Sequence, residues 1–335
     1  MNDSMAAYVV EESGGALKGG VGQVSLAGLP AGDVTIRIQY SSVNYKDAMA
    51  AHGVGGMVRR FPHVPGVDLA GEVVSDTSGV FSAGRKVLAT GFDLGVEVWG
   101  GFAQYARVPA GWVVPLPAGL DMWEAMAIGT AGLTAMLSLM ALERHRLKSA
   151  DGPVLVLGAT GGVGSLAVDI LSGAGYEVAA ATGNSTHQAW ISRLGAAWVV
   201  DRRELAEPSP KMLTKATWAG VVDPVGGSLL ANVLKGIKPG GAAAVSGLVG
   251  GADLHTSVYP FILRGASLLG VDSAHCPNDL RQTAWTRLAG GNKPRHLSNI
   301  ARTIHLEGLP GVFSMMLNRA AEHIPGRMVV ELPHF

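Results

Sequence analysis

The sequence is poor in cysteine, in charge and in long apolar runs. Cys276 is the only cysteine of the 335 residues, which excludes an intramolecular disulfide and a zinc site built on several thiolates. Charged residues make up 16%, with 26 basic and 26 acidic side chains. This balance gives no long-range field that attracts nucleic acid or anionic lipid, so we expect neither as a partner.

The chain start and the hydropathy give no membrane or export signal. Residues 1–4 lack the basic-then-apolar layout of a signal peptide, and no uninterrupted apolar run approaches the ~20 residues of a membrane span. We therefore expect a cytoplasmic protein. The length suits two domains, and 48% hydrophobic residues with 47 glycines are typical of a compact α/β enzyme.

The sequence changes character near residue 125. Before it, short β-rich runs punctuated by prolines predict a small barrel-like β domain. The predicted strands are Val34–Ile38, Val67–Val74, Arg85–Ala89, Phe102–Val108 and Trp112–Leu116. Trp123–Leu147 then has apolar residues at helical spacing.

From residue 154 to 272, short apolar runs alternate with helical segments, which predicts a doubly wound parallel sheet. The predicted strands are Val154–Leu157, Val178–Ala181, Trp198–Val200, Val221–Val222, Ala242–Val245 and Leu268–Val271. The tail predicts helices near Asp279–Ala289 and Pro310–Ala321. Its closing strand, Arg327–Leu332, is expected to rejoin the β domain.

A glycine-rich turn, Gly158–Gly164, joins the first of these strands to a helix. Glycines at this spacing let the backbone approach a pyrophosphate, and the helix N-terminus supplies free N–H donors. The alternative is a plain tight turn, but the strand, helix and following βα units favour a dinucleotide site.

The end of the second strand indicates which dinucleotide binds. An acidic residue there would accept from the ribose 2′-OH of NAD, but Ala179–Ser185 holds none. Thr182, Asn184 and Ser185 offer hydrogen bonds to a 2′-phosphate, with Arg193 or Arg202 supplying charge. NADPH is therefore predicted as the cofactor; alternatively, these residues form only a solvated turn.

Several segments carry a resemblance to a known family. They are Ser42–Ala48, Arg59–Pro62, Val64–Gly71, Trp99–Gly101, Ala127–Gly132, Asp223–Gly227 and Pro260–Gly265. In these the chain resembles the medium-chain dehydrogenases/reductases, in their zinc-free quinone oxidoreductase branch, and within it the acrylyl-CoA reductase type.

This resemblance implies a GroES-like β-barrel catalytic domain over 1–125, completed by 273–335. It implies a Rossmann domain over 126–272, a cofactor in the cleft between the two, and homodimers through the edge strand around Leu268–Val271. The cofactor contacts expected on this basis are Thr130, Thr160, Gly161, Gly162, Val163, Thr182, Asn184, Arg202, Gly247, Leu248 and Arg327.

The sequence also departs from relatives within the superfamily. Where zinc alcohol dehydrogenases place their first metal-binding cysteine, this chain has Val43-Asn44-Tyr45, so no metal is expected. Where family members often carry an arginine for the 2′-phosphate, it has Asn184. The loop Thr90–Trp99, which walls the substrate pocket in the family, also differs.

Without a metal, the natural reaction is hydride transfer to the β-carbon of an electron-poor alkene. A neutral donor facing the conjugated carbonyl would stabilise the developing enolate. Tyr45 and Asn44 are the predicted donors, with Asp47 setting local geometry or charge. Alternatively, Tyr45 is a packed loop residue.

Arg60, with Arg59 beside it, is predicted to bind a substrate carboxylate or CoA phosphate, together with Phe92 and Trp99 at the substrate. The two arginines are otherwise ordinary surface residues. Asp68 is expected to bond loop backbone. Three hypotheses follow: an NADPH-dependent enoyl reductase, an NADPH:quinone reductase, or an NADPH-binding protein without catalysis.

Overall fold

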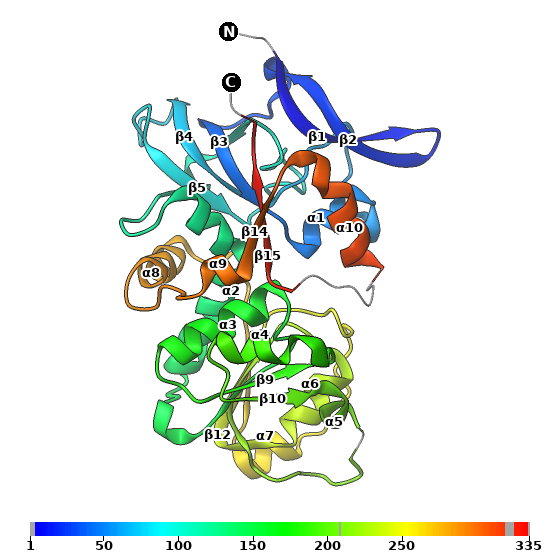
Figure 1. The fold of residues 1–335 in the computed structure, drawn as a ribbon, viewed down its shortest axis with the longest axis vertical. Coiled ribbons are helices and arrows are strands. Elements are labelled where there is room, and N and C mark those ends of the chain that lie inside the picture. The colour runs from blue at the N-terminus through cyan, green and yellow to red at the C-terminus, as the bar shows by residue number, and fades with distance from the viewer. Residues whose placement is uncertain (1–3, 208, 319–324, 334–335) are drawn as a thin grey trace. The chain divides into compact units, whose positions relative to one another are not determined.

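The computed structural model describes residues 4–207, 209–318 and 325–333 (Figure 1). The chain forms two compact units. The first is Met1–Thr130, Ala274–Gln282 and Leu297–Phe335, and the second is Ala131–Ser273 and Thr283–His296. The first division therefore falls five residues later than the sequence predicts, and part of the tail belongs to the second unit.

The first unit is built on strands that the sequence largely predicts. A seven-stranded sheet has the order β14-β15-β3-β4-β5-β7, with β6 paired to β3. Its strands are β3 (Val34–Ser42), β4 (Asp68–Asp76), β5 (Lys86–Thr90), β6 (Tyr105–Val108), β7 (Val113–Pro115), β14 (Ala301–Ile304) and β15 (Arg327–Glu331). The blue hairpin of Figure 1, β1 (Ser4–Ser13) and β2 (Ala16–Ser25), was not predicted.

Alternation of side chains explains how these strands bury a core. Val34, Ile36 and Ile38 of β3 are buried at every second position, as expected for a strand with one face on the core. β15 pairs antiparallel with β3, which confirms that the closing strand rejoins the β domain.

Besides the start of the long helix α2 (Met122–Arg144), the described residues of the first unit include three whole α-helices and part of a fourth. They are α1 (Tyr45–Ala51), α8 (Asn278–Ala289), α9 (Leu297–Ile300) and α10 (Leu309–Leu317). Phe313 of α10 packs edge-on against Tyr8, with ring centroids 5.6 Å apart. The predicted helix Pro310–Ala321 is thus found as α10, while its residues 319–321 lie outside the described part of the chain.

The second unit contains the predicted parallel sheet, and all six predicted strands are confirmed. The order is β10-β9-β8-β11-β12-β13, with every pairing parallel. The strands are β8 (Val154–Val156), β9 (Val178–Thr182), β10 (Trp198–Asp201), β11 (Trp218–Asp223), β12 (Ile237–Val245) and β13 (Ser267–Gly270). The order reverses between β8 and β11, which is where such sheets bind ligands.

The helices of the second unit connect these strands. They are α3 (Gly162–Gly173), α4 (Gln188–Arg193), α5 (Arg202–Ala206), α6 (Gly227–Leu234) and α7 (Tyr259–Arg264). The long helix α2 (Met122–Arg144) begins in the first unit and ends in the second. By length and composition α2 could cross a bilayer, although polar residues interrupt its apolar stretch. Because 94% of its apolar window is buried, it is a core helix.

Gly71 of β4 provides a test of the packing of the first sheet. A Cβ added there would lie 2.0 Å from the carbonyl oxygen of Arg37 in β3, so the strands would have to separate. We expect Gly71→Ala to lower the free energy of unfolding by about 1–3 kcal/mol, measured by urea denaturation. Gly111→Ala, where a Cβ meets nothing within 4 Å, is the matched control; equal loss in both variants would contradict this packing.

Candidate active site

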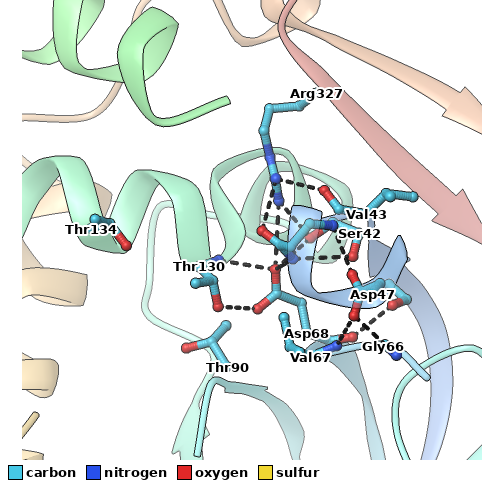
Figure 2. A network of polar contacts seen from close by, with 12 residues as sticks. Ser42, Val43, Asp47, Gly66, Val67, Asp68, Thr90, Thr130, Thr134 and Arg327 are labelled. Carbon is cyan, nitrogen blue, oxygen red and sulfur yellow. Dashed lines mark hydrogen bonds and ion pairs between the residues drawn. The ribbon is translucent and has the colours of Figure 1, made fainter. Parts of the chain in front are cut away.

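A buried carboxylate organises the polar network of the first unit (Figure 2). Asp68, at the start of β4, is fully buried. Its Oδ2 accepts from Ser42 Oγ at 2.7 Å, from Asn44 Nδ2 at 2.7 Å and from the Thr130 main-chain N–H at 3.0 Å. The Thr130 hydroxyl donates to the other oxygen, Oδ1. The hydrogen-bond donors to Asp68 are therefore mainly side chains, which corrects the expectation that Asp68 bonds loop backbone.

Arg327 of β15 supplies the positive charge of this network. Its Nη2 lies 3.5 Å from Asp68 Oδ2 and donates to Ser42 Oγ at 2.7 Å. Its Nη1 donates to the Val43 carbonyl at 2.8 Å and to Asn44 Oδ1 at 3.0 Å. Burial lowers the pKa of Arg327, while Asp68 and Asp47 raise it. Both terminal nitrogens of Arg327, which was predicted as a cofactor contact, bond to residues of its own unit.

The buried carboxylate of Asp47 binds main-chain N–H groups at the start of α1. Its side chain is fully buried and accepts from the main-chain N–H groups of Asn44 at 2.7 Å, Val67 at 2.9 Å and Gly66 at 3.2 Å. Burial raises the pKa of Asp47 to about 7, against the lowering effect of the N–H donors. No part of the Asp47 side chain reaches solvent, which agrees with the prediction that it sets local geometry rather than contacting the substrate.

Asn44 and Tyr45, the two predicted donors, are placed differently. The Asn44 amide is bonded at both ends, to Asp68 through Nδ2 and to Arg327 through Oδ1. Tyr45 is the first residue of α1, where the alternative interpretation had a packed loop residue. Its side chain is 37% exposed, and its phenol has no hydrogen-bond partner among the described residues. Of the two, Tyr45 has the hydroxyl that is free to donate.

Phe92 has a strained backbone conformation, and its ring packs between an indole and a guanidinium group. Its φ is +53°, a region that non-glycine residues rarely occupy. The ring stacks on Trp112 with centroids 5.2 Å apart, and the guanidinium of Arg281 lies 4.3 Å from its centre. Arg281 is fully buried and donates to the Thr90 carbonyl at 2.6 Å. Sequence reasoning missed Arg281, since nothing in the tail distinguishes it from a surface arginine.

Trp99 and Arg60, the other predicted substrate residues, lie on connected loops. The indole N–H of Trp99 donates to the Pro62 carbonyl at 3.1 Å. The next residue, His63, exchanges main-chain hydrogen bonds with Val10. Arg59 and Arg60 precede this anchored segment, are exposed, and have no ion-pair partner in the described parts of the chain. The loop therefore presents two exposed guanidinium groups just before the carbonyl that binds the Trp99 indole.

The glycine turn of the second unit has the geometry of a phosphate site. Gly158 has φ +59°, and a Cβ on Gly164 would lie 2.2 Å from the Gly158 carbonyl oxygen, so both positions require glycine. Thr160 and Gly161 precede α3, and Gly162 and Val163 are its first residues. The N–H groups of Gly162 and Val163, in the first turn of α3, have no acceptor within the helix. Around Gly161 a Cβ would meet only the Gly158 oxygen, at 3.4 Å, which leaves room for a pyrophosphate.

The end of β9 brings together the predicted 2′-phosphate residues. Thr182 Oγ1 accepts from the Asn184 N–H at 3.1 Å, and Asn184 Oδ1 accepts from the Thr186 N–H at 3.0 Å. The Arg202 side chain lies against Gly183, since a Cβ there would be 2.3 Å from its Nε. Arg202 is exposed and has no ion-pair partner among the described residues, whereas Arg203 is paired with Asp201.

Two further loops follow strands of the same sheet. After β11, Asp223 accepts from the N–H groups of Val225 at 2.7 Å and Gly226 at 3.0 Å. After β12, a Cβ on Gly247 would lie 2.2 Å from the Pro224 carbonyl oxygen, and Leu248 is 65% exposed. Gly158, Thr182, Asp223 and Gly247 thus lie at the carboxyl ends of parallel strands, the edge where open α/β sheets bind ligands. Within the described residues, no three His, Cys, Asp or Glu side chains form a group that could hold a metal.

Comparisons with known proteins agree with both units. Residues 30–118 match the alcohol dehydrogenase GroES-like domain, and residues 162–290 match the zinc-binding dehydrogenase family. The acrylyl-CoA reductase AcuI of Ruegeria pomeroyi is 46% identical over 96% of this chain and 97% of its own length. This chain belongs to the medium-chain dehydrogenase/reductase superfamily. The predicted family and fold class are confirmed.

Two further members of the superfamily show the range of names among close relatives. The putative quinone oxidoreductase YhfP of Bacillus subtilis is 46% identical over 92% of this chain and 93% of its own length. Its crystal structure with NAD bound has a TM-score of 0.94. The YhdH oxidoreductase of Salmonella enterica, crystallised with NADP, also has a TM-score of 0.94, with 43% identity over 98% of this chain and all of that one. The chain is thus an oxidoreductase that acts on a small molecule.

The buried Asp47 predicts a pH dependence of stability. In the unfolded chain an aspartate has a pKa of about 3.9, and burial raises it to about 7 in the folded chain. Between these values the folded chain holds a proton that the unfolded chain has released. The stabilisation is therefore complete below about pH 4 and is lost as the pH rises through about 7, by at most about 1.4 kcal/mol per pH unit.

Urea denaturation at pH 5, 6, 7 and 8 measures this slope. We expect Asp47→Asn to be less stable at pH 5 but to lose the slope. Asp253→Asn, an exposed aspartate of the second unit, should keep it. A slope unchanged in Asp47→Asn would contradict the assigned titration.

Proposed function

We propose that this protein is an NADPH-dependent reductase of the activated C=C bond of an α,β-unsaturated thioester or ketone. The observation that carries the proposal is the unpartnered phenol of Tyr45, held at the start of α1 by the Asp47 and Asp68 networks. The relative AcuI, whose name states acrylyl-CoA reduction, supports the substrate class.

The chemistry follows from where charge develops. Bound NADPH supplies a hydride for the β-carbon of the alkene. Negative charge then collects on the conjugated carbonyl oxygen, and a donor fixed in advance at that oxygen stabilises it. A proton from the solvent then adds to the α-carbon and completes the reduction. In this proposal the Tyr45 hydroxyl is that donor, and Asn44 with Asp47 orients it rather than contacting the substrate.

NADPH is held, in this proposal, by the residues at the strand ends of the second unit. The N–H groups of Gly162 and Val163, next to Thr160 and Gly161, take the pyrophosphate, and Thr182, Asn184 and Arg202 take the 2′-phosphate. Gly247 and Leu248 line the cofactor farther along the sheet edge. Thr130, predicted as a further cofactor contact, gives its N–H and hydroxyl hydrogen to Asp68. The lack of an acid over Ala179–Ser185 supports NADPH, although the relative YhfP was crystallised with NAD.

The substrate end of the proposal rests on exposed groups of the first unit. Arg59 and Arg60 are free to bind the phosphates of a CoA thioester, since phosphates favour guanidinium partners. Phe92 and Trp99 supply the aromatic surface beside the acyl group. A quinone has no phosphate for these arginines to bind. We therefore favour a CoA thioester over a quinone as the substrate.

The second unit also supports assembly as a homodimer, which we propose for the protein in the cytoplasm. β13 ends the sheet without a further strand among the described residues, and an open edge strand invites pairing with another chain. Near it in sequence, Ile262, Leu263 and Leu268 are exposed. A two-fold related copy would cover these apolar side chains.

Initial rates of NADPH oxidation test the function directly. Acryloyl-CoA, crotonyl-CoA, methyl vinyl ketone and a small quinone are compared at equal concentration. We expect acryloyl-CoA to give the largest kcat/KM. If no activated alkene exceeds the quinone, the enoyl reductase proposal fails in favour of quinone reduction; if none of the four is reduced, the protein binds NADPH without catalysis.

The role of Tyr45 predicts a particular kinetic change. Tyr45→Phe removes only the hydroxyl, so we expect kcat with acryloyl-CoA to fall about 10²-fold or more while KM stays within about threefold. Tyr105→Phe, a tyrosine in β6, serves as the matched control and should retain full kcat. A Tyr45→Phe enzyme with normal kcat would remove the phenol from the mechanism.

Arg202 is expected to decide between the two dinucleotides. Losing a charged hydrogen bond to the 2′-phosphate costs about 1.5–3 kcal/mol, so Arg202→Gln should weaken NADPH roughly 10-fold to 100-fold. NADH, which lacks that phosphate, should bind as before. Arg203→Gln is the control because its guanidinium is engaged by Asp201. Fluorescence titration of both cofactors gives the ratio, and equal weakening of NADPH and NADH would refute the assignment.

A further inference from the structure

The second unit contains a cavity of about 600 Å³ that the proposed function does not use. It lies where α2 ends and where β11 begins, and it is also lined by residues of β12. Its apolar lining includes Leu142, Leu147, Ala219 and Ala242. Its volume is in the range of small-molecule sites, roughly 300–1,000 Å³, and charged side chains line it beside these apolar residues.

Cationic side chains dominate the polar lining of this cavity. The cations are Arg144, Arg146 and Lys238, the imidazole of His145 also lines the cavity, and Asp151 is the one acid among the lining residues. The Asp151 carboxylate already accepts from the Lys148 N–H at 2.8 Å. Lys238 Nζ donates to the Asp151 main-chain carbonyl at 2.7 Å.

The two arginines are left without an anionic partner. Glu143, the nearest acid along α2, is held by both terminal nitrogens of Arg287, at 2.5 and 3.0 Å. Neither Arg144 nor Arg146 has an ion-pair partner within residues 4–207, 209–318 and 325–333. The cavity therefore carries positive charge that the described chain does not neutralise.

The backbone of Arg146 gives an independent reason to look for a role of its side chain. Arg146 follows the end of α2 with φ +71°. Its N–H bonds to the Glu143 carbonyl at 2.8 Å, and the Leu147 N–H bonds to the Leu142 carbonyl at 3.0 Å. This pair of bonds ends many helices, and the left-handed residue is then usually glycine. Arginine is strained at this position, and strain of this kind collects at functional sites.

We propose that this cavity binds a small organic phosphate, with Arg144, Arg146 and Lys238 holding the phosphate oxygens. Arginine forks match phosphate oxygens in pairs, and lysine contributes a point charge. Gly240 and Gly241, also in the lining, have no Cβ and leave the backbone open to the ligand. The apolar residues of the lining receive the organic part.

This site is separate from the turn that the dinucleotide needs. Ala219 lies near the start of β11, whereas Asp223 ends the same strand and fixes the loop beside the cofactor turn. The two ligands can therefore bind at once, and NADP⁺ can be used to block the turn. The proposal is independent of which substrate the protein reduces.

Isothermal titration calorimetry with inorganic pyrophosphate, in saturating NADP⁺, tests the site. We expect one saturable event per chain. In the double variant Arg144→Gln/Arg146→Gln, Kd should rise at least 10-fold. Arg302→Gln, an exposed arginine of β14 outside the cavity, should bind as the parent protein does. No saturable binding up to about 10 mM, or equal binding by the double variant, would overturn the proposal.

Arg146→Gly separates the side chain from the backbone. Because glycine accepts the left-handed conformation without strain, this variant should melt about 2–4 °C higher than the parent without pyrophosphate. Its Kd for pyrophosphate should nevertheless rise at least threefold. If the Arg146→Gly variant binds pyrophosphate as tightly as the parent, then Arg146 only ends the helix, and the site assignment fails.

Discussion

The first unit depends on satisfying one buried charge, the carboxylate of Asp68. Three segments far apart in sequence meet at it: the stretch between β3 and α1 with Ser42 and Asn44, Thr130 in α2, and Arg327 in β15. A buried carboxylate is tolerated only when it is paired and fully hydrogen-bonded. Each of these segments is therefore fixed by the need to supply Asp68 with a donor.

The same requirement explains the interruption of α2. Gly129 has φ +51°, and a Cβ there would lie 2.5 Å from Arg327 Nη2 and 2.7 Å from Asp68 Oδ2. Only glycine lets the helix backbone come close enough for the next residue, Thr130, to donate from its N–H and its hydroxyl to Asp68. The non-helical Gly129 thus serves the carboxylate at the expense of regular helix geometry. Asp47 plays the complementary part: it binds the backbone of the loop and of Asn44, and Tyr45 is left as the residue with an uncommitted hydroxyl.

The sequence predicts those features that depend on neighbours along the chain. The six strands of the second unit, the glycine turn and the closing strand β15 all follow from local periodicity and turn residues. The hairpin β1–β2 was missed because β2 has Gly19, Gly20 and Gly22 and is mostly exposed, so it lacks an alternating pattern. The roles of Asn44 and Arg327 depend on a contact between residues 283 positions apart, which no local pattern reveals. For the same reason Arg281, buried against Thr90 and Phe92, was not found.

Two residues have a strained backbone that no pattern in the sequence indicates. Among the described non-glycine residues, Phe92 and Arg146 have positive φ. For Phe92 the compensation is visible, because the ring is held between Trp112 and the Arg281 guanidinium. Arg146 is exposed and makes no comparable contact, so nothing within the described chain offsets its strain. Since a glycine would form the same helix end with less strain, the side chain rather than the turn must account for the arginine. A bound anion is the contact that a guanidinium in a cationic cavity lacks.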